Sequence, residues 1–523
     1  MSGLKQAGGR RRTTSGFPAS ARVLLEDAQL RKNVKHATDI IVGKRLRVVE
    51  EMSDWGQLRE AGSRIRAHVL EHLGPYLVQF EAACNRAGGQ VHWAANAAQA
   101  NRIALALVRR RQALEVIKIK SMTTEEIGLN RFLARHGIRA HETDLAELII
   151  QLGKDRPSHI VVPALHKNRR QVREIFRREM GLESLGERPE DLAAAARSYL
   201  REKFLRIPVA IGGANFLIAE TGGVCVVESE GNGRMCLTLP KVLIAIAGIE
   251  KVIPRFQDLE VFLQTLPRSA TGERMNPYNS IWTGVHPGDG PEEFHVILLD
   301  NGRSAILHDR EASQTLKCIR CAACQNVCPV YRQTGGHAYN SVYAGPIGAI
   351  LTPQLHQLRK GSSLPYASSL CGACYEVCPV KIDIPEVLIH LRGKIVERRK
   401  ADLAARLDPW NLGMEAASAA LASGARLEIA QALGRVAQRP FVAKNGFIER
   451  LPFLLDGWTK HRDLAPIPRE SFRQWWKRRG SRPGAGSAAD PGASQRARGG
   501  FGASAGGGTA GTGPTTPEGK HVP

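Results

Sequence analysis

The pattern of apolar and polar positions divides the chain into regions of different character. From about residue 66 to 300, short β-branched runs alternate with stretches whose apolar residues recur at helical spacing. This alternation is typical of an α/β layered sheet. The pattern predicts strands at 116–120, 138–143, 159–162, 210–219, 223–228 and 294–299, and helices at 145–152 and 167–179. The Gly and Asn residues at 231–233 predict a turn between two strands.

Helical, cysteine-rich and low-complexity segments make up the rest of the chain. The beginning is polar and helical in character, with a basic start, and a second helical stretch follows the cysteines. Gly, Ala, Ser, Thr and Pro dominate the end, a composition that buries too little apolar surface to become ordered. The sequence predicts a helical extension (1–65), an α/β domain (66–304), a helical cysteine-rich domain (305–395), a helical C-terminal region (396–479) and a disordered tail (480–523).

The sequence predicts a cytoplasmic protein without a transmembrane segment. The longest apolar runs, such as residues 242–249, are far shorter than the roughly 20 residues that cross a bilayer. Arg10, Arg11 and Arg12 are not followed by an apolar run, so they do not form a signal peptide. Any association with a membrane is expected to be made through partner proteins.

Seven of the ten cysteines lie in two short runs. Four are spaced C-x2-C-x2-C-x3-C before Pro329, and three are spaced C-x2-C-x3-C before Pro379. The first spacing is the bacterial ferredoxin pattern, in which the fourth cysteine serves the other cluster. Each proline stops the local helix and turns the chain away. The two runs therefore predict two iron–sulfur clusters and the transfer of single electrons.

The exchange of last cysteines assigns the ligands. Three cysteines of a tight loop reach three corners of a cubane, and the fourth corner is filled from a remote segment. We expect the first [4Fe–4S] cluster to be held by Cys318, Cys321, Cys324 and Cys378. We expect the second to be held by Cys328, Cys371 and Cys374.

The second cluster has only three certain cysteine ligands. A complete second run would carry another cysteine three residues before Cys371, where the chain has Ser368. The second cluster is therefore either a three-iron cluster or a four-iron cluster with an oxygen, a water or a distant ligand at its open corner. Cys84, Cys225 and Cys236 are the spare thiols.

Zinc and disulfides are the alternative interpretations of these cysteines. A structural zinc site uses four ligands, typically two C-x2-C pairs, and requires neither a third cysteine two residues later nor a Cys-Pro step in each run. Disulfides are typical of small secreted domains. Both alternatives fit the spacing less well than iron and sulfide.

The formal net charge of +23 raises the alternative of a cluster-bearing nucleic-acid-binding protein. The count treats the cysteines as neutral, whereas a thiolate-bound cubane is negatively charged. The basic residues are also scattered, with only short runs such as 109–111 and 477–479, and spread charge is typical of a solvated surface. An acidic partner subunit explains the charge better than nucleic acid does.

The cysteine runs and several other segments resemble the B protein of the bacterial lactate-utilisation system. The segments that carry the resemblance are CIRCAACQNVCPVY, LPYASSLCGACYEVCPVKIDIPE, SMTTEEIGLN, HKNRRQVREIF, AIGGANFLIAETGGVCVVESEGN and FIERLPFLLDGWTKHRDLAPIPRESFRQWW. The resemblance spans about residues 60–478, and a second run with three cysteines is typical of that family.

The resemblance implies a fold and a function. It implies a lactate-utilisation (LUD) domain similar to CoA-transferase and sugar-phosphate-isomerase domains, followed by a helical two-cluster ferredoxin domain. It implies the iron–sulfur subunit of a complex that oxidises L-lactate to pyruvate and permits growth on lactate, with electron transfer rather than lactate chemistry in this chain. The implied partners are a cysteine-rich redox subunit, a small LUD protein and a quinone or another electron acceptor. A CoA-transferase-like enzyme with accessory clusters is the alternative.

Three further features lie outside the cysteine runs. The loop 220–223 either binds an anion or forms a tight turn that uses the backbone freedom of glycine. Glu228 is a candidate acyl-accepting carboxylate. Residues 121–126 follow a predicted strand and either cap a helix or, with Lys118 and Lys120 nearby, bind an anion.

Overall fold

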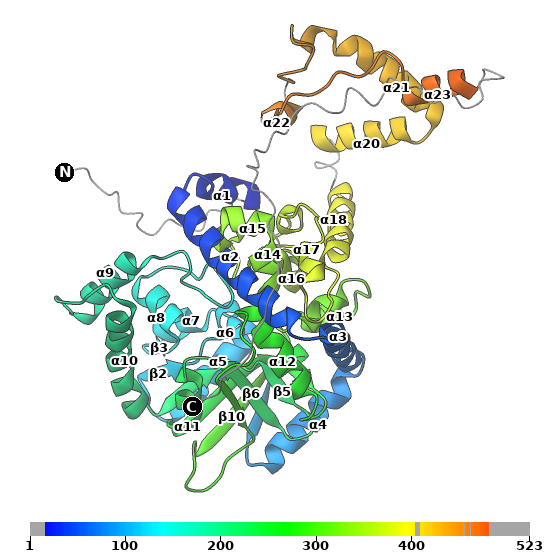
Figure 1. The fold of residues 1–523 in the computed structure, drawn as a ribbon. Helices are drawn as coiled ribbons and strands as arrows, with labels where there is room; N and C mark the ends of the chain where they lie inside the picture. Colours follow the sequence, from blue (N-terminus) through cyan, green and yellow to red (C-terminus); the bar gives the residue numbers. More distant parts are fainter. Residues whose placement is uncertain (1–15, 403–407, 453–454, 461, 481–523) are drawn as a thin grey trace, which may run out of the picture. The chain divides into compact units, whose positions relative to one another are not determined.

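The structure is a computed structural model that describes residues 16–402, 408–452, 455–460 and 462–480 (Figure 1). Residues 481–523 of the predicted disordered tail, and the basic start of the chain, lie outside the described residues. The chain divides into two compact units, Met1–Ala401 and Asp402–Pro523. Among the described residues, no helix combines the length and the apolar character needed to cross a membrane.

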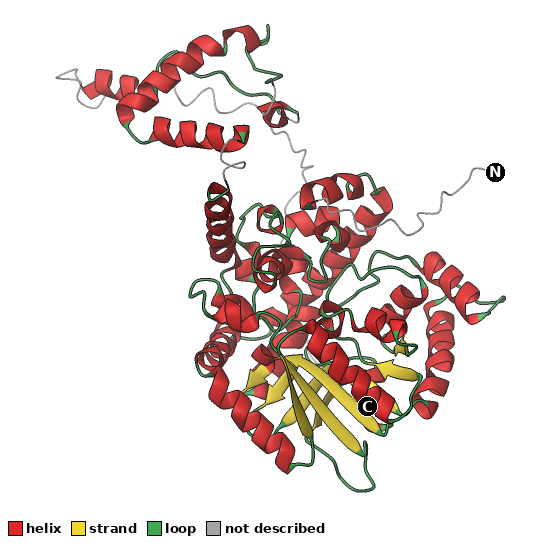
Figure 2. Cartoon of the chain, turned by 180° about the vertical axis from the view of Figure 1, so that it is seen from behind, coloured by secondary structure: helices red, strands yellow, loops and turns green. Residues whose placement is uncertain are grey.

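A six-stranded parallel sheet lies at the centre of the α/β part of the first unit (Figure 2). The strands, in spatial order, are β1 (Gln90–Ala94), β10 (Glu293–Leu299), β7 (Val242–Gly248), β4 (Val209–Gly212), β2 (Glu115–Lys118) and β3 (Arg139–Glu142). Strands β4 and β7 are buried at every position. Continuous apolar strands of this kind are expected where helices cover both faces of a parallel sheet.

Two sets of helices cover the two faces of this sheet. The covering helices are α4 (Leu73–Arg86), α5 (Ala97–Arg110), α7 (Leu129–Arg135) and α10 (Pro189–Arg206). Val116 and Ile244 share one apolar cluster with α5 and α7, whereas their neighbours Ile117 and Ala245 share another with α4 and α10. The period-2 alternation of strand side chains therefore separates two cores.

A second sheet of four strands adjoins the first. Its strands, in spatial order, are β8 (Val252–Ile253), β5 (Phe216–Ile218), β6 (Gly223–Glu228) and β9 (Tyr278–Trp282). Strand β5 pairs with β6 in antiparallel orientation. The predicted single strand at 210–219 is therefore wrong, because the chain leaves β4 in one sheet and enters β5 in the other.

The remaining helices of the α/β part lie in the connections between strands. They are α6 (Met122–Glu126), α8 (Leu145–Leu152), α9 (Arg169–Met180), α11 (Asn232–Thr238), η1 (Ile249–Lys251) and α12 (Leu259–Ala270). Asp144 caps α8, and Asn168 with Gln171 forms a capping box on α9. The predicted turn at 231–233 instead leads into α11, which separates β6 from β7.

The predicted strand at 159–162 is also wrong. His159 Nδ1 accepts the backbone N–H groups of Val161 (3.1 Å) and Val162 (2.9 Å), which bends the chain locally. The other ring nitrogen of His159 lies 3.1 Å from Asn326 Oδ1. This segment therefore lies against the cysteine-rich part of the chain and does not enter a sheet.

The cysteine-rich part consists of short helices. They are α13 (Arg303–Leu307), η2 (Ser313–Lys317), α14 (Ala323–Val327), α15 (Pro329–Thr334), η3 (Gly336–Tyr339), α16 (Gly345–Leu355), η4 (Leu364–Tyr366), α17 (Ala373–Glu376) and α18 (Ile384–Lys400).

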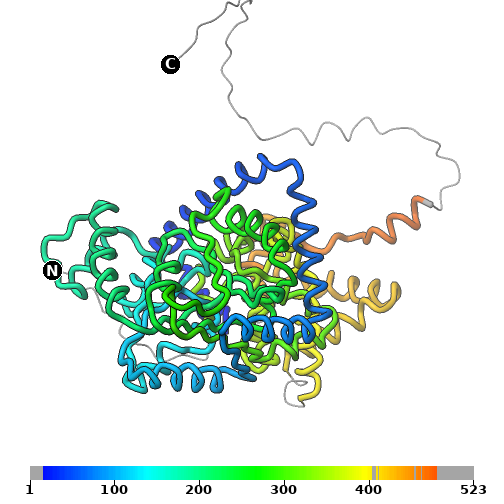
Figure 3. Tube along the Cα trace, turned by 90° about the horizontal axis from the view of Figure 1, so that it is seen from below, coloured from blue at the N-terminus to red at the C-terminus, as the bar shows by residue number. Residues whose placement is uncertain are grey.

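Three N-terminal helices precede the α/β part: α1 (Phe17–Leu24), α2 (Ala28–Glu50) and α3 (Trp55–Glu71). Helix α2 packs against α12, α14 and α15, so it lies beside segments that follow much later in the chain (Figure 3).

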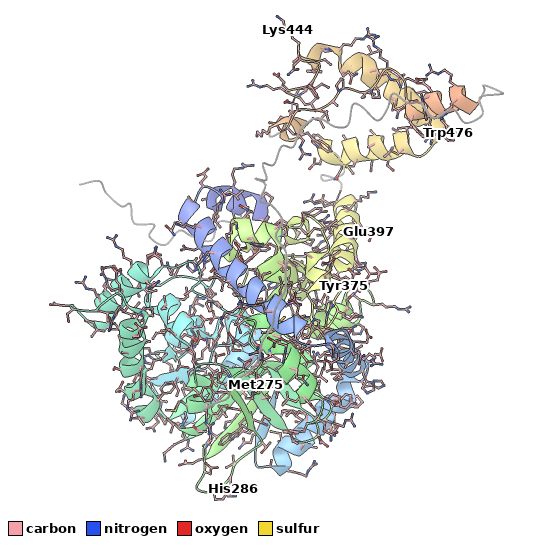
Figure 4. The ribbon with its side chains drawn as sticks, in the orientation of Figure 1. Met275, His286, Tyr375, Glu397, Lys444 and Trp476 are labelled. Atoms are coloured by element: carbon pink, nitrogen blue, oxygen red, sulfur yellow. The ribbon has the colours of Figure 1, made fainter. Side chains whose placement is uncertain are left out.

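The second unit contains helices in its described residues. They are α20 (Pro409–Leu421), α21 (Gly424–Ala437), η5 (Arg439–Phe441), α22 (Asp456–Thr459) and α23 (Phe472–Gly480). Ser423 caps α21, and Ile448 bridges Val442 and Leu464. Helix α23 presents Trp476 to solvent (Figure 4).

Candidate metal centre

Both cysteine runs lead into short helices. Cys318 follows η2, Cys324 lies in α14, and Cys328 caps α15, which begins at Pro329. Proline suits the first position of a helix because its missing N–H would be unpaired there in any case. In the second run Cys374 lies in α17, but Pro379 lies in a turn and the next helix, α18, begins only at Ile384.

Four cysteines from the two runs line one cavity. They are Cys318, Cys321, Cys324 and Cys378, and none is more than 9% exposed. The rest of the lining is almost entirely apolar: Ile319, Ala322, Ala323, Ile347, Pro379, Val380, Ile382 and Ile384. The structure thus brings the last cysteine of the second run to the first three cysteines of the first run.

Backbone N–H groups point at sulfur atoms in this cavity. Arg320 donates to Cys318 Sγ at 3.4 Å, and Ile382 donates to Cys378 Sγ at 3.4 Å. Burial raises the pKa of the Cys321 thiol, and the neighbouring Cys378 and Cys318 raise it further. Thiolates crowded together away from water need bound cations, which iron supplies.

Basic side chains surround these four cysteines. The surrounding residues, called the cationic shell below, are Arg45, Arg59, Arg66, Lys251 and Arg320. Arg59 Nε donates to the carbonyl of Cys378 at 2.9 Å, and Arg66 Nη2 donates to that of Leu316 at 2.9 Å. The prediction that the scattered basic residues form a solvated surface is wrong for this group, because Arg45, Arg66 and Lys251 are buried.

A chain of buried ion pairs joins the cationic shell to the α/β part. Arg320 lies 3.2 Å from Glu250, Glu250 lies 2.5 Å from Arg303, and Arg303 lies 2.9 Å from Glu126. The Tyr343 hydroxyl donates to Glu126 at 2.6 Å. Burial alone would raise the pKa of Glu250, but Arg303 and Arg320 outweigh burial and hold it at about 2. These contacts couple the cavity firmly to the end of strand β7.

The other three cysteines form a second group nearer to solvent. Cys371 is exposed, whereas Cys328 and Cys374 are buried. The N–H of Tyr331 donates to Cys328 Sγ at 3.5 Å. Burial raises the pKa of Cys374 to about 12, and the neighbouring Cys328 and Cys371 contribute to the rise. The structure therefore brings the last cysteine of the first run to the two others of the second run.

The Tyr339 hydroxyl is an unused donor near both cysteine groups. Tyr339 is 2% exposed, and its hydroxyl has no hydrogen-bond partner among the described residues. Burial raises its pKa, and Cys328, Tyr331 and Cys324 add to the rise. A buried phenol ordinarily finds an acceptor, and the sulfur atoms of a cluster would provide one. The thiols, the N–H donors and this phenol all fit iron–sulfur clusters.

The three spare cysteines lie in the α/β part. Cys84 lies in α4, Cys225 in β6 and Cys236 in α11, and none of them lines the cavity. Burial raises the pKa of Cys84 to about 11 and that of Cys225 and Cys236 to about 12. Such buried, protonated thiols are chemically inert.

The loop 220–223 and Glu228 have structural partners. The loop is the turn of the β5–β6 hairpin, and Gly222 adopts a φ of 68°. Glu228 Oε2 accepts the N–H groups of Glu230 (2.8 Å) and Gly231 (2.6 Å), which tightens the entry to α11. The structure favours the tight-turn interpretation of the loop and gives Glu228 no free carboxylate for acyl transfer.

The structure favours the capping interpretation of residues 121–126 over an anion site, and Lys120 donates to the carbonyl of Val161. Lys118 is 1% exposed and lies 2.5 Å from Glu142 and 3.0 Å from Glu125. Burial would lower the pKa of Lys118, but these two carboxylates hold it above its ordinary value. Ser121 caps α6 by accepting the N–H of Thr124 at 3.3 Å. The ammonium group is therefore already neutralised.

The sequence interpretation missed the cationic shell and Tyr339. Arg320 lies inside the first cysteine run, and from this position the sequence could have predicted a basic side chain beside the cysteines. Arg45, Arg59 and Arg66 lie on α2 and α3, and no local pattern marks them. Only the tertiary fold brings these side chains to the cysteines.

Comparison with known proteins identifies both parts of the first unit. Residues 77–299 match the LUD domain family, and residues 314–382 match the 4Fe-4S dicluster domain family. The second match indicates that the chain carries two [4Fe–4S] clusters.

Several similar proteins are named Lactate utilization protein B. The protein from Oceanobacillus iheyensis is 44% identical over 438 residues, covering 83% of this chain and 90% of that protein. The protein from Exiguobacterium sp. is 44% identical over 461 residues, covering 87% of this chain and 96% of that protein. A crystal structure of a DUF162 family protein from Deinococcus radiodurans covers 43% of this chain and 98% of that chain at 13% identity, and its TM-score of 0.25 is too low to support an argument.

Proposed function

Because the chain belongs to the lactate utilization protein B family, we propose that it is the iron–sulfur electron-transfer subunit of a complex that oxidises L-lactate to pyruvate. One observation carries the proposal: the two cysteine runs interleave into two groups, one buried in the cationic shell and one open to solvent at Cys371. A buried centre beside an exposed one is the arrangement that an electron relay requires.

The proposed ligands follow the two groups of cysteines. We propose that the first cluster is held by Cys318, Cys321, Cys324 and Cys378, and the second by Cys328, Cys371 and Cys374. When bound, such clusters accept and release one electron at a time. The N–H groups of Arg320 and Ile382 support the first assignment because they point at two of the proposed ligand sulfurs.

We propose that the LUD domain of residues 66–304 positions the cluster domain of residues 305–395. The buried ion pairs from Arg303 through Glu250 to Arg320 support this division of labour because they fix one part against the other. Lactate chemistry is then assigned to the assembled complex and not to this chain alone.

The exposed side of the second cysteine group is the proposed exit for electrons. Tyr375, on α17 between Cys374 and Cys378, is 38% exposed (Figure 4). The proposed partners are a cysteine-rich redox subunit and a small LUD protein, with a quinone or another acceptor beyond them. Oxidation of lactate releases two electrons, and two one-electron centres can divide them.

Reduction by lactate tests the proposal. The full chain is purified anaerobically, alone and with its sister subunits, and low-temperature EPR follows the clusters after L-lactate is added. We expect reduction in the complex and none in the isolated chain. A complex that carries Cys378→Ala in this chain is the control, and it should lose the signal of one cluster. Reduction of the isolated chain by lactate, or no reduction in the complete complex, would contradict the proposal.

A further inference from the structure

The loop before Cys371 repeats the backbone of the loop before Cys321. The residues on either side of Cys321 have φ angles of 63° and 62°, and those on either side of Cys371 have φ angles of 56° and 82°. These flanking residues are Arg320 and Ala322 in the first run and Leu370 and Gly372 in the second. A left-handed backbone costs a non-glycine residue about 1 kcal/mol, so its repetition indicates that the tertiary structure imposes one loop shape twice.

The equivalence extends to the side chain at the start of each loop. Cys318 Sγ accepts the N–H of Arg320, two residues later, at 3.4 Å. Ser368 Oγ accepts the N–H of Leu370, two residues later, at 3.1 Å. The Ser368 oxygen therefore occupies in the second loop the place that a sulfur atom occupies in the first.

The backbone of Ser368 is held from a second direction. Arg392, on α18, donates to the carbonyl of Ser368 at 3.4 Å and to that of Pro365 at 2.9 Å. Ser368 is half-buried, whereas the next residue, Ser369, is exposed. The hydroxyl of Ser368 is thus placed by its surroundings, and Ser369 provides a matched serine without this placement.

We infer that the Ser368 oxygen is the fourth ligand of the second cluster. The inference rests on the proposed ligands of that cluster, whose three cysteines leave one iron without a thiolate. The hydroxyl releases its proton to solvent and its oxygen donates an electron pair to that iron, so no oxidant or reductant is needed. Oxygen is a harder ligand than sulfur, and this corner of the cluster is therefore chemically distinct from the other three.

Three variants of the full chain test the inference: Ser368→Ala, Ser368→Cys and the control Ser369→Ala. Each is reconstituted anaerobically with 57Fe, and its iron content, Mössbauer spectrum and EPR spectrum are compared with those of the natural chain. We expect Ser368→Ala to lose about one iron per chain and to gain the EPR signal of an oxidised three-iron cluster. We expect Ser368→Cys to retain all its iron and to lose the one iron site of oxygen character, while Ser369→Ala changes nothing.

The outcomes separate the inference from the proposed function. If Ser368→Ala loses the whole second cluster, retention of that cluster in Ser368→Cys still supports a ligand at this position. A Ser368→Ala protein with the iron content and spectra of the natural chain would overturn the inference, because water or a distant group would then fill the corner. A three-iron signal in the natural chain would also overturn it. In every case the signal of the first cluster reports independently on the electron-transfer proposal.

Discussion

The two cysteine groups lie in one compact unit but in different surroundings. The first group has four buried cysteines inside the cationic shell, whereas the second has three cysteines, of which Cys371 is exposed. Cations in a low-dielectric interior stabilise added negative charge more strongly than cations in water do. For the proposed electron relay, two runs of nearly the same spacing thus provide a buried site that would favour holding an electron and an open site that would favour exchanging one. The surroundings distinguish the sites more than the cysteine spacing does.

The largest expected effect comes from removing the cysteine that each run is proposed to contribute to the cluster of the other run. Cys378→Ala should remove the first cluster and leave much of the second, although Cys378 belongs to the second run. Cys328→Ala should do the reverse, because the second cluster has too few thiolates to lose one. Low-temperature EPR and iron content of the two variants measure this crossover. If each variant instead lost the cluster of its own run, the two groups would not be interleaved.

Removing a buried charge tests how strongly the cationic shell supports the first group. Arg66 donates to the carbonyls of Val252 (2.9 Å), Leu316 (2.9 Å) and Lys317 (3.3 Å). Arg66→Met should lower the free energy of unfolding by about 3 kcal/mol or more, because these carbonyls lose a charged donor. Anaerobic urea unfolding measures the loss. Arg64→Met, on the exposed side of the same helix, is the control and should change stability little.

The Tyr339 phenol should affect the second cluster more than the first. A hydrogen bond to a cluster sulfur that contributes about 1 kcal/mol more in the reduced state corresponds to ~40 mV in a one-electron couple. Tyr339→Phe should therefore lower the potential of the second cluster by about this amount in an EPR-monitored redox titration. Tyr331→Phe is the matched control, because its hydroxyl already donates to the carbonyl of Ser158 at 2.7 Å. Equal shifts of this potential in the two variants would contradict the assignment of the Tyr339 hydroxyl as a hydrogen-bond donor to the second cluster.

The smallest effect is expected at the spare thiols. Cys225→Ala and Cys236→Ala should leave the iron content and both EPR signals unchanged, because neither side chain lines the cysteine cavity. Each should lower stability by about 1 kcal/mol through lost packing. Thermal unfolding and iron analysis measure the two quantities. Loss of iron in either variant would show that the seven cysteines of the two runs are not the only thiols on which the clusters depend.

Local patterns predicted those elements whose causes are local. The predicted helix at 145–152 and strand at 223–228 agree with α8 and β6. The apolar periodicity of each element, and for α8 the cap at Asp144, depend only on residues that are neighbours in the sequence. The cysteine spacing predicted two iron–sulfur clusters for the same reason, since ligand geometry in a tight loop depends on a few consecutive residues.

The errors arose where distant contacts decide the conformation. Residues 159–162 have the composition of a strand, but the His159 ring contacts Asn326 and accepts the N–H groups of Val161 and Val162. The cationic shell could not be predicted for the same reason, because Arg45 and Arg66 carry no local mark of burial. Ser368 was recognised as a missing cysteine, yet its equivalence to Cys318 required the backbone angles.

The contacts of Arg45 and Arg59 also constrain how the chain is made. Arg59 donates to the carbonyl of Cys378, 319 positions later, and Arg45 donates to that of Val377, 332 positions later. At a bacterial synthesis rate of about 5–20 residues per second, these acceptors leave the ribosome between about 15 and 65 seconds after their donors. Helices α2 and α3 therefore complete their native packing only after the second cysteine run has left the ribosome. We expect cluster insertion to be a late step in the maturation of the protein.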